Sequence, residues 1–257
     1  MMIDFGKTAD DYARFRAGFP PEFFARLAAL GFARPGVKAL DLGSGTGTIA
    51  LGLAARGCDV TALDPAAAML AEAAARAKES GVALRTIEAK AESTGLPDAA
   101  FDLVVAGQCW HWFDRPRAAG EARRVLKPGG ALMMAHFDWL ALPGNIVAAT
   151  EALILRYSPE WKGAGKSAPY APWYLDLRNA AFAGIESFSF EIDVPYAHEA
   201  WRGRIRASAG VGASLSPEKV AAFDAEHAAL LARDFSADPL AVPHRCWAVW
   251  GRKISPT

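Results

Sequence analysis

The sequence lacks an excess of either charge and has few cysteines. Its 28 basic and 28 acidic residues balance, so the electrostatic signature of a nucleic-acid-binding or membrane-surface protein is missing. The three cysteines are widely separated and form neither a disulfide framework nor a metal-binding spacing. We therefore expect free thiols, a small-molecule ligand and no nucleic-acid partner.

Long apolar segments are also absent, and we expect no leader sequence. No uninterrupted apolar stretch reaches the roughly 18 residues of a membrane span. Residues 1–19 carry charged side chains throughout and do not resemble a signal peptide. With 52% hydrophobic and 22% charged residues, the chain can bury a large core. We expect a soluble, cytoplasmic protein without a membrane partner, either a monomer or a homodimer.

Short apolar segments alternate with alanine-rich helical segments between residues 37 and 138. The expected strands are 37–42, 59–63, 82–88, 101–106 and 131–136, and the expected helices are 48–56, 65–80 and 116–126. A turn at 127–130 should lead into the last of these strands. The alternation predicts βαβ units with right-handed crossovers, and hence a Rossmann-like, doubly wound, mostly parallel α/β sheet.

The flanking regions depart from this alternation. Residues 9–30 predict a helical lead-in that Gly18, Pro20 and Pro21 interrupt. Downstream, we expect helices at 145–157, 173–183 and 197–235, a strand at 187–194 and an antiparallel closing strand at 242–250. We treat residues 1–257 as one domain, composed of a lead-in (1–36), a cofactor-binding core (37–138), a mixed region with a helical cap (139–241) and a closing strand with its tail (242–257).

A glycine loop, Asp41-Leu42-Gly43-Ser44-Gly45-Thr46-Gly47, follows the first expected strand. Glycine lacks Cβ and tolerates positive φ, so a ligand can approach such a backbone closely. A dinucleotide fingerprint, G-x-G-x-x-G, would place its third glycine at position 48, where Thr48 stands. The spacing therefore favours a sulfonium cofactor over a pyrophosphate cofactor.

An acidic residue, Asp64, ends the next expected strand. A carboxylate at this position can accept hydrogen bonds from both hydroxyls of a ribose. The alternative is that Asp64 caps the helix that begins at Pro65, because aspartate is a favoured capping residue. The two roles are compatible. The ribose role implies an adenosine at the carboxyl ends of the strands, whether the cofactor is a sulfonium or a pyrophosphate.

Several motifs resemble those of one protein family and occur in the same order along the chain. Residues 39–47 resemble the first motif of class I S-adenosylmethionine-dependent methyltransferases of the type 11 grouping. Later motifs are matched by Ala91-Glu92 with Leu96-Pro97, by Phe101-Asp102-Leu103-Val104 and by Arg124-Val125-Leu126-Lys127-Pro128-Gly129-Gly130. Residues 12–16 with Phe19-Pro20, and residues 108–114, are similar to the small-molecule branch that includes trans-aconitate methyltransferase-like proteins. The resemblance covers roughly residues 8–138.

This resemblance implies S-adenosylmethionine as the cofactor and a seven-stranded sheet with an antiparallel last strand and a helical cap. It assigns Asp41, Gly43, Ser44, Gly45 and Gly47 to the methionine part, Asp64 to the ribose, Ala91 and Glu92 to the adenine, and Tyr12, Arg16 and Gln108 to the surroundings of the cofactor. Many relatives carry an aspartate where Lys90 stands, so adenine recognition would depend more on Glu92 and the backbone.

The reaction itself needs little from the protein beyond alignment and a dry pocket, because the cofactor is already activated. A base is needed only if the acceptor loses a proton. His111 is the residue near the expected methyl position with a pKa near neutrality. In one interpretation, His111 is a general base or a group that orients the acceptor. In the other, it belongs to a packed lid over the cofactor. Trp110 and Trp112 are either core residues or aromatic faces for a sulfonium or an apolar acceptor.

The region 139–235 is rich in aromatic residues and carries Arg202, Arg204 and Arg206. Aromatic walls with an arginine suit a planar or apolar acid. Alternate positions on a helix do not share one face, so at most one or two of these arginines should line a pocket. We expect methyl transfer to a small-molecule acceptor such as a carboxylate or a hydroxyl.

Three other functions remain open. One is an NAD(P)-dependent oxidoreductase on a similar sheet, which Thr48 and the lack of a Tyr-x-x-x-Lys pair disfavour. Another is a non-catalytic protein that binds S-adenosylmethionine. The last is a nucleic-acid methyltransferase, which the balanced charge and the missing base-clamping motif disfavour.

Overall fold

The computed structural model describes residues 15 and 17–254. Tyr12 and Arg16, two of the predicted cofactor residues, lie outside these residues. The described chain forms two compact units. The sheet unit contains residues 18–137, 169–190 and 246–254, and the helical unit contains residues 15, 17, 138–168 and 191–245.

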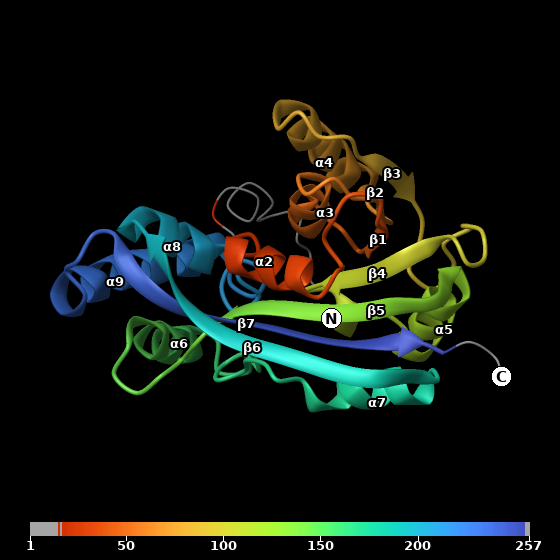
Figure 1. Cartoon of the computed structure of the whole chain (residues 1–257). Coiled ribbons are helices and arrows are strands. Elements are labelled where there is room, and N and C mark those ends of the chain that lie inside the picture. Colours follow the sequence, from red (N-terminus) through yellow and green to blue (C-terminus); the bar gives the residue numbers. More distant parts are fainter. Residues whose placement is uncertain (1–14, 16, 255–257) are drawn as a thin grey trace. The chain divides into compact units, whose positions relative to one another are not determined.

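A seven-stranded sheet has the order β3-β2-β1-β4-β5-β7-β6 (Figure 1). Its strands are β1 Lys38–Leu42, β2 Asp59–Asp64, β3 Arg85–Glu88, β4 Phe101–Gly107, β5 Leu126–Trp139, β6 Phe182–Tyr196 and β7 Leu240–Lys253. The first five strands pair in parallel and the last strands are antiparallel. The predicted Rossmann-like, doubly wound α/β fold is therefore confirmed.

The central strands are apolar because both of their faces are covered. Ala39 and Leu40 of β1 lie opposite Leu103 and Val104 of β4, and all four side chains are fully buried. Continuous apolar runs are typical of parallel strands buried on two faces. Burial of one such leucine contributes roughly 1.5–3 kcal/mol, so this pair of strands anchors the loop that follows β1.

Several of the helices begin at a capping side chain or a proline. Their bounds are α2 Pro21–Ala29, α3 Thr48–Ala54, α4 Ala67–Glu79, α5 Arg115–Val125, α6 Ile146–Tyr157, α7 Ala171–Asn179, α8 His198–Arg206 and α9 Pro217–Asp234, with a 3₁₀ turn, η2, at Trp110–Trp112. At the start of α6, the Asn145 side chain accepts a hydrogen bond from the N–H of Ala148 at 2.9 Å. Asparagine at this position satisfies a backbone donor that the helix leaves unpaired.

None of the helices among the described residues is both long and apolar enough to cross a bilayer.

Several predicted elements differ from the structure. The helix predicted at 173–183 ends at Asn179, and residues 182–183 already belong to β6. Residues 127–130 do not form a separate turn, because β5 already begins at Leu126 and contains them. A shift in the β4–β5 register between Phe101 and Leu103 accommodates the Pro-Gly-Gly sequence there. The predicted helix over 197–235 is divided into α8 and α9, since the chain turns between residues 207 and 216 and a capped proline restarts it at Pro217.

The helical unit has its own core, built from α6, α8 and α9. Trp201 and Phe223 are fully buried in this core. Thr150 Oγ1 accepts a hydrogen bond from the indole Nε1–H of Trp201 at 3.2 Å and lies 3.2 Å from Nε2 of His227. One hydroxyl therefore joins the three helices through polar groups that would otherwise be buried without partners.

Candidate active site

The glycine loop leaves β1 in the left-handed backbone region that favours glycine. Gly43, Gly45 and Gly47 have φ values of 63°, 53° and 82°. Gly47 is the residue from which α3 begins. A side chain at any of these positions would be strained, so the sequence G-x-G-x-G is required by the conformation of the loop.

The glycines differ in what surrounds them. A Cβ at Gly43 would lie 2.9 Å from Sγ of Cys109 and 3.0 Å from Cζ of Phe113, so Gly43 allows η2 and its flanks to pack against the loop. A Cβ at Gly45 would meet no atom within 4 Å. Gly45 therefore borders open space, where a ligand can approach the backbone.

Ser44 is held by its backbone and not by its side chain. Its N–H donates to the carbonyl of Leu63 at 3.0 Å, and its carbonyl accepts from the N–H of Gly47 at 2.8 Å. Oγ is buried and has no hydrogen-bond partner among the residues that the structure describes. A buried hydroxyl without a partner is costly, and it is a group that a bound ligand can satisfy.

Asp41 lies beneath the loop with only 2% of its surface exposed. Its Oδ2 accepts a hydrogen bond from the N–H of Ala50, in the first turn of α3, at 3.0 Å. Burial raises the pKa of Asp41 from 3.8 to about 8, the hydrogen bond from Ala50 opposes this shift, and the neighbouring charge of Asp64 adds to it. The carboxyl group is therefore poised to change its charge near neutral pH.

Asp64 connects the glycine loop to the end of β2. Its Oδ2 accepts from the N–H of Gly45 at 2.9 Å, and its Oδ1 accepts from the N–H of Ala66 at 2.9 Å. Ala66 is the residue from which α4 begins, so the carboxylate also satisfies a donor at a helix start. Each carboxylate oxygen has a second lone pair, so ribose hydroxyls can still donate to Asp64. The ribose role stays a prediction.

Ala91 and Glu92 follow β3 in the same unit. Ala91 is buried, and Glu92 Oε1 accepts from the N–H of Asp114 at 2.8 Å. Asp114 caps α5 by accepting from the N–H of Arg117 at 3.3 Å. Glu92 thus links the turn after β3 to the start of α5, and its adenine role stays a prediction.

Gln108 follows β4 with a φ of 62°, which is unusual for a residue with a side chain. Its N–H donates to the carbonyl of Ala135 at 2.8 Å, and its Nε2 donates to the carbonyl of Phe137 at 2.9 Å. The next residue, Cys109, donates from Sγ to the carbonyl of Leu42 at 3.1 Å. Strained backbone of this kind is typical of functional sites, and here two strands hold it in place.

The tryptophans of η2 have opposite environments. Trp110 is fully buried and donates from Nε1 to Oδ2 of Asp176 at 2.9 Å, so its interpretation as a core residue is confirmed. Trp112 is 58% exposed, so the same interpretation is wrong for Trp112. His111 lies between them on the surface, with its ring centroid 4.7 Å from that of Trp112. The role of His111 stays a prediction.

Sequence reasoning missed a second histidine at this site. His136 is buried in β5, and its ring centroid lies 5.5 Å from that of His111. It also lies 4.5 Å from Tyr170 and 5.1 Å from Trp173, and those two rings stack at 4.7 Å. His136 ends the predicted strand 131–136, and a titratable residue at the carboxyl end of a parallel strand was the signal available.

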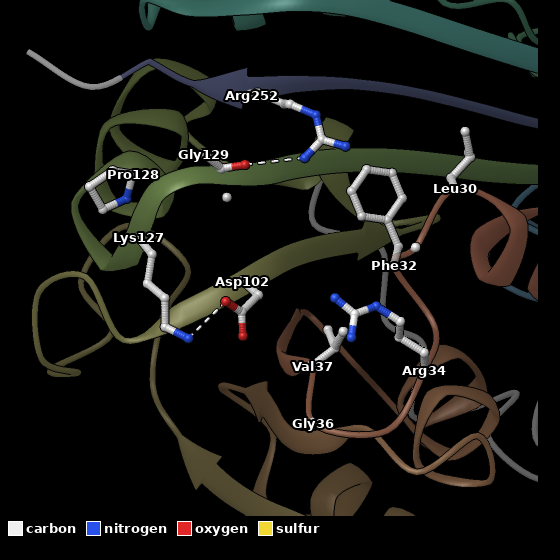
Figure 2. Close-up of a pocket in the computed structure, with 12 residues that line it drawn as sticks. Leu30, Phe32, Arg34, Gly36, Val37, Asp102, Lys127, Pro128, Gly129 and Arg252 are labelled. Carbon is white, nitrogen blue, oxygen red and sulfur yellow. Dashed lines mark hydrogen bonds and ion pairs between the residues drawn. The ribbon is translucent and has the colours of Figure 1, made fainter.

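A cavity of about 480 Å³ lies at the other ends of the strands, opposite to the ends that carry the glycine loop (Figure 2). Lys127 pairs there with Asp102 at 2.7 Å, and Arg252 donates to the carbonyl of Gly129 at 3.2 Å. None of the predicted site residues lines this cavity. It lies where β1, β4 and β5 begin, whereas doubly wound sheets bind their ligands at the carboxyl ends of the strands.

The described residues also contain no group of three His, Cys, Asp or Glu side chains placed to hold a metal ion.

Comparison with known proteins identifies the part of the chain that carries the loop. Residues 40–134 match the family model described as a methyltransferase domain. This segment is therefore similar to a methyltransferase domain. It contains the glycine loop, Asp64, Glu92 and His111, so every predicted site residue within the described chain belongs to it.

Individual relatives agree with this assignment. An uncharacterised methyltransferase of Mycobacterium bovis is 39% identical over 153 residues, which cover 57% of this chain and 60% of that protein. The chain therefore spans less than two thirds of this curated relative. A solved protein described as a type II methyltransferase from Anaeromyxobacter dehalogenans is 25% identical, with a TM-score of 0.63 over 94% of this chain and all of that one (100%).

A more distant structure shares the fold alone. Phosphoethanolamine N-methyltransferase 2 of Haemonchus contortus was solved with phosphomonomethylethanolamine and S-adenosylhomocysteine. It is 17% identical, with a TM-score of 0.58, and the match covers 98% of this chain and 58% of that one.

Proposed function

We propose that this protein transfers the methyl group of S-adenosylmethionine to a small-molecule acceptor. The observation that carries the proposal is the contact between Asp64 and the N–H of Gly45 inside the matched methyltransferase segment. This contact places a carboxylate beside an open glycine backbone at the carboxyl ends of β1 and β2. An adenosine with a charged amino-acid tail needs both features, one for its ribose and one for its tail.

The residues present fit this cofactor. Ser44 offers a buried hydroxyl without a partner among the described residues, Gly45 borders open space, and Asp64 retains free lone pairs. On this proposal Asp41 and the loop hold the methionine part, Asp64 the ribose, and Ala91 with Glu92 the adenine. When bound, the cofactor supplies a methyl group activated by a sulfonium.

The acceptor side is proposed to lie around His111. His111 and His136 present two imidazoles beside the stacked rings of Tyr170 and Trp173. These aromatic side chains line the acceptor side, and His111 takes the proton from a hydroxyl acceptor. A carboxylate acceptor needs no base, so with that acceptor His111 only orients the substrate. Membership of the trans-aconitate methyltransferase-like branch is part of the same proposal.

Two alternatives make different use of the same sheet. An NAD(P)-dependent oxidoreductase would bind a pyrophosphate at the loop, but α3 starts at Thr48, where that fingerprint requires a glycine. A non-catalytic protein would bind S-adenosylmethionine without transferring its methyl group. The exposed His111 and Trp112 beside the loop favour a catalytic protein, because a pure binder has no use for an acceptor site.

Isothermal titration calorimetry with S-adenosylmethionine, S-adenosylhomocysteine, NADH and NADPH separates these functions. We expect binding of both sulfur compounds and of neither nicotinamide. Incubation with S-adenosylmethionine and pooled small acids and phenols, followed by mass spectrometry, should then detect S-adenosylhomocysteine and a product heavier by one methylene. Absence of binding to either sulfur compound overturns the proposal, and binding without product favours the non-catalytic alternative.

A further inference from the structure

The three arginines of α8 have different environments. Arg202 and Arg206 stand one helical turn apart and share one face, where both form ion pairs with Asp224 and Glu199. Arg204 points away from that face. Among the residues that the structure describes, no group accepts a hydrogen bond from its guanidinium, and no acid lies within ion-pair distance of it. Two of the three arginines are therefore explained by the fold, and Arg204 is not.

Arg204 rests on an aromatic ring. Its Cζ lies 4.7 Å from the ring centroid of Trp139. The ring is fixed, because Trp139 donates from Nε1 to Oε1 of Glu151 at 2.9 Å and packs edge-on against Trp201 at 5.5 Å. A cation stacked in this way contacts the ring through its flat face, which leaves the N–H groups at its edge without acceptors.

Arg204 is half-buried and keeps N–H groups that a ligand can use. Burial lowers the pKa of Arg204, and the neighbouring Tyr196 and Asp138 oppose that shift. The contact with Trp139 supplies no acceptor for its N–H groups. The planar edge of a guanidinium matches the two oxygens of a carboxylate, so an organic acid would satisfy it.

The side chains around Arg204 define the shape and charge of such an acid. Tyr196 and His244 lie nearly parallel, with their rings at 20° and their centroids 6.0 Å apart. The carbonyl of Val242 lies 2.9 Å from Nδ1 of His244, and burial lowers the pKa of His244 to about 4, so its ring is neutral at pH 7. Among the described residues, the charge of Asp138 acts on both Arg204 and His244, and that of Asp193 acts on His244. Aromatic rings beside one cation, with acids nearby, favour a planar ligand with a single negative charge.

We propose that Arg204 is the anion-binding residue of the helical unit and that its ligand is a small, planar monocarboxylic acid. The site is formed by α8, the ends of β5 and β6 and the starting part of β7, all within the helical unit. The assignment does not depend on the cofactor site. It goes beyond the proposed function by adding a second ligand site with its own chemistry.

Benzoate and its neutral isostere benzamide are the probes for this site. We expect titration at constant ionic strength, followed by NMR, to show saturable benzoate binding in the millimolar range or tighter, with much weaker binding of benzamide. Arg204→Gln should weaken benzoate binding at least tenfold. Arg233→Gln is the matched control, because it removes the same charge from an exposed arginine of α9 that pairs only with Asp234 among the described acids.

Arg204→Lys keeps the charge but loses the planar edge, so it should weaken benzoate binding several-fold even if Arg204→Gln does not fold. Binding of S-adenosylmethionine by each variant, together with its circular dichroism, verifies that the protein is intact. The proposal is overturned if the wild-type protein does not bind benzoate, if benzamide binds equally well, or if neither Arg204 variant changes the affinity.

Discussion

The carboxylate of Asp64 accepts a hydrogen bond from the backbone N–H of Gly45 at 2.9 Å, and this contact joins the end of β2 to the loop after β1. The same carboxylate accepts from the N–H of Ala66 at the start of α4. One side chain thus sets the position of the loop and presents the remaining lone pairs of its oxygens to a ligand. Its two possible roles, in folding and in binding, can be separated by experiment.

Replacing Asp64 with alanine should weaken binding of S-adenosylmethionine by roughly 1–3 kcal/mol, because hydroxyl donors of the ribose would lose their acceptor. Glu88→Ala is the matched control, since Glu88 ends β3 and lies beside Asp64 in the parallel register. Calorimetry on both variants gives the comparison. Unchanged affinity in a folded Asp64→Ala protein would restrict Asp64 to holding the backbone.

Substitutions of Gly43 and Gly45 should have different consequences. Gly45→Val should abolish cofactor binding, because its side chain would fill the open space beside the loop. Gly43→Ala should chiefly lower the free energy of unfolding, because its Cβ would lie 2.9 Å from Sγ of Cys109. Chemical denaturation and calorimetry on both variants test this. Retained binding by Gly45→Val would mean that the loop does not face the ligand.

The parts of the fold that were predictable from the sequence depend on local patterns. The apolar run before Gly43 and the run at 101–106 predict buried parallel strands, since few other structures bury such segments on both faces. The break between α8 and α9 was missed although the sequence carries local signals for it. Gly210 and Gly212 are residues that end helices, and Ser216-Pro217 is a typical helix start.

The residues of the candidate site were likewise predictable only where a local pattern determines them. The glycine loop and Asp64 were predictable, because the conformation and chemistry of that turn restrict the residues that it accepts. The partner of Glu92, the N–H of Asp114, lies 22 positions away, and His136 contacts Tyr170 from another segment of the sheet unit. Sequence spacing alone does not indicate such contacts. They depend on how the strands and α7 pack.

Ionisation of Asp41 should make cofactor binding depend on pH. Its pKa in the folded protein is raised to about 8, so the carboxyl group is mostly neutral at pH 6.5 and mostly ionised at pH 8.5. If Asp41 meets the ammonium of the methionine part, affinity for S-adenosylmethionine should rise about tenfold over this range. Asp41→Asn should remove the rise, while Asp59→Asn, at the exposed start of β2, should retain it. Equal pH profiles for all three proteins would contradict the role of Asp41.

Acidification should weaken the helical unit through His227. Its pKa is lowered to about 4 by burial, against 6.5 for an ordinary histidine. Between these values the unfolded chain binds a proton that the folded protein does not, so the free energy of unfolding falls as the pH drops from 6.5 to 4, by about 1.4 kcal/mol per pH unit. Above pH 6.5 the effect vanishes. His227→Gln should reduce the slope in urea denaturation between pH 7 and 5. An unchanged slope in His227→Gln would show that other groups govern acid unfolding.

Removal of the His111 imidazole should affect the chemical step and not cofactor binding. With a hydroxyl acceptor, His111→Ala should lower kcat by roughly 10²- to 10⁴-fold, the usual contribution of a general base, and should remove the acidic limb of the pH–rate profile. The Kd of S-adenosylmethionine should stay the same, because no predicted cofactor contact involves this side chain. Trp112→Ala serves as the control, since Trp112 is an exposed neighbour in η2 that has no proton to exchange in this pH range. A pH–rate profile with unaltered height and shape in His111→Ala would leave His111 with a packing role only.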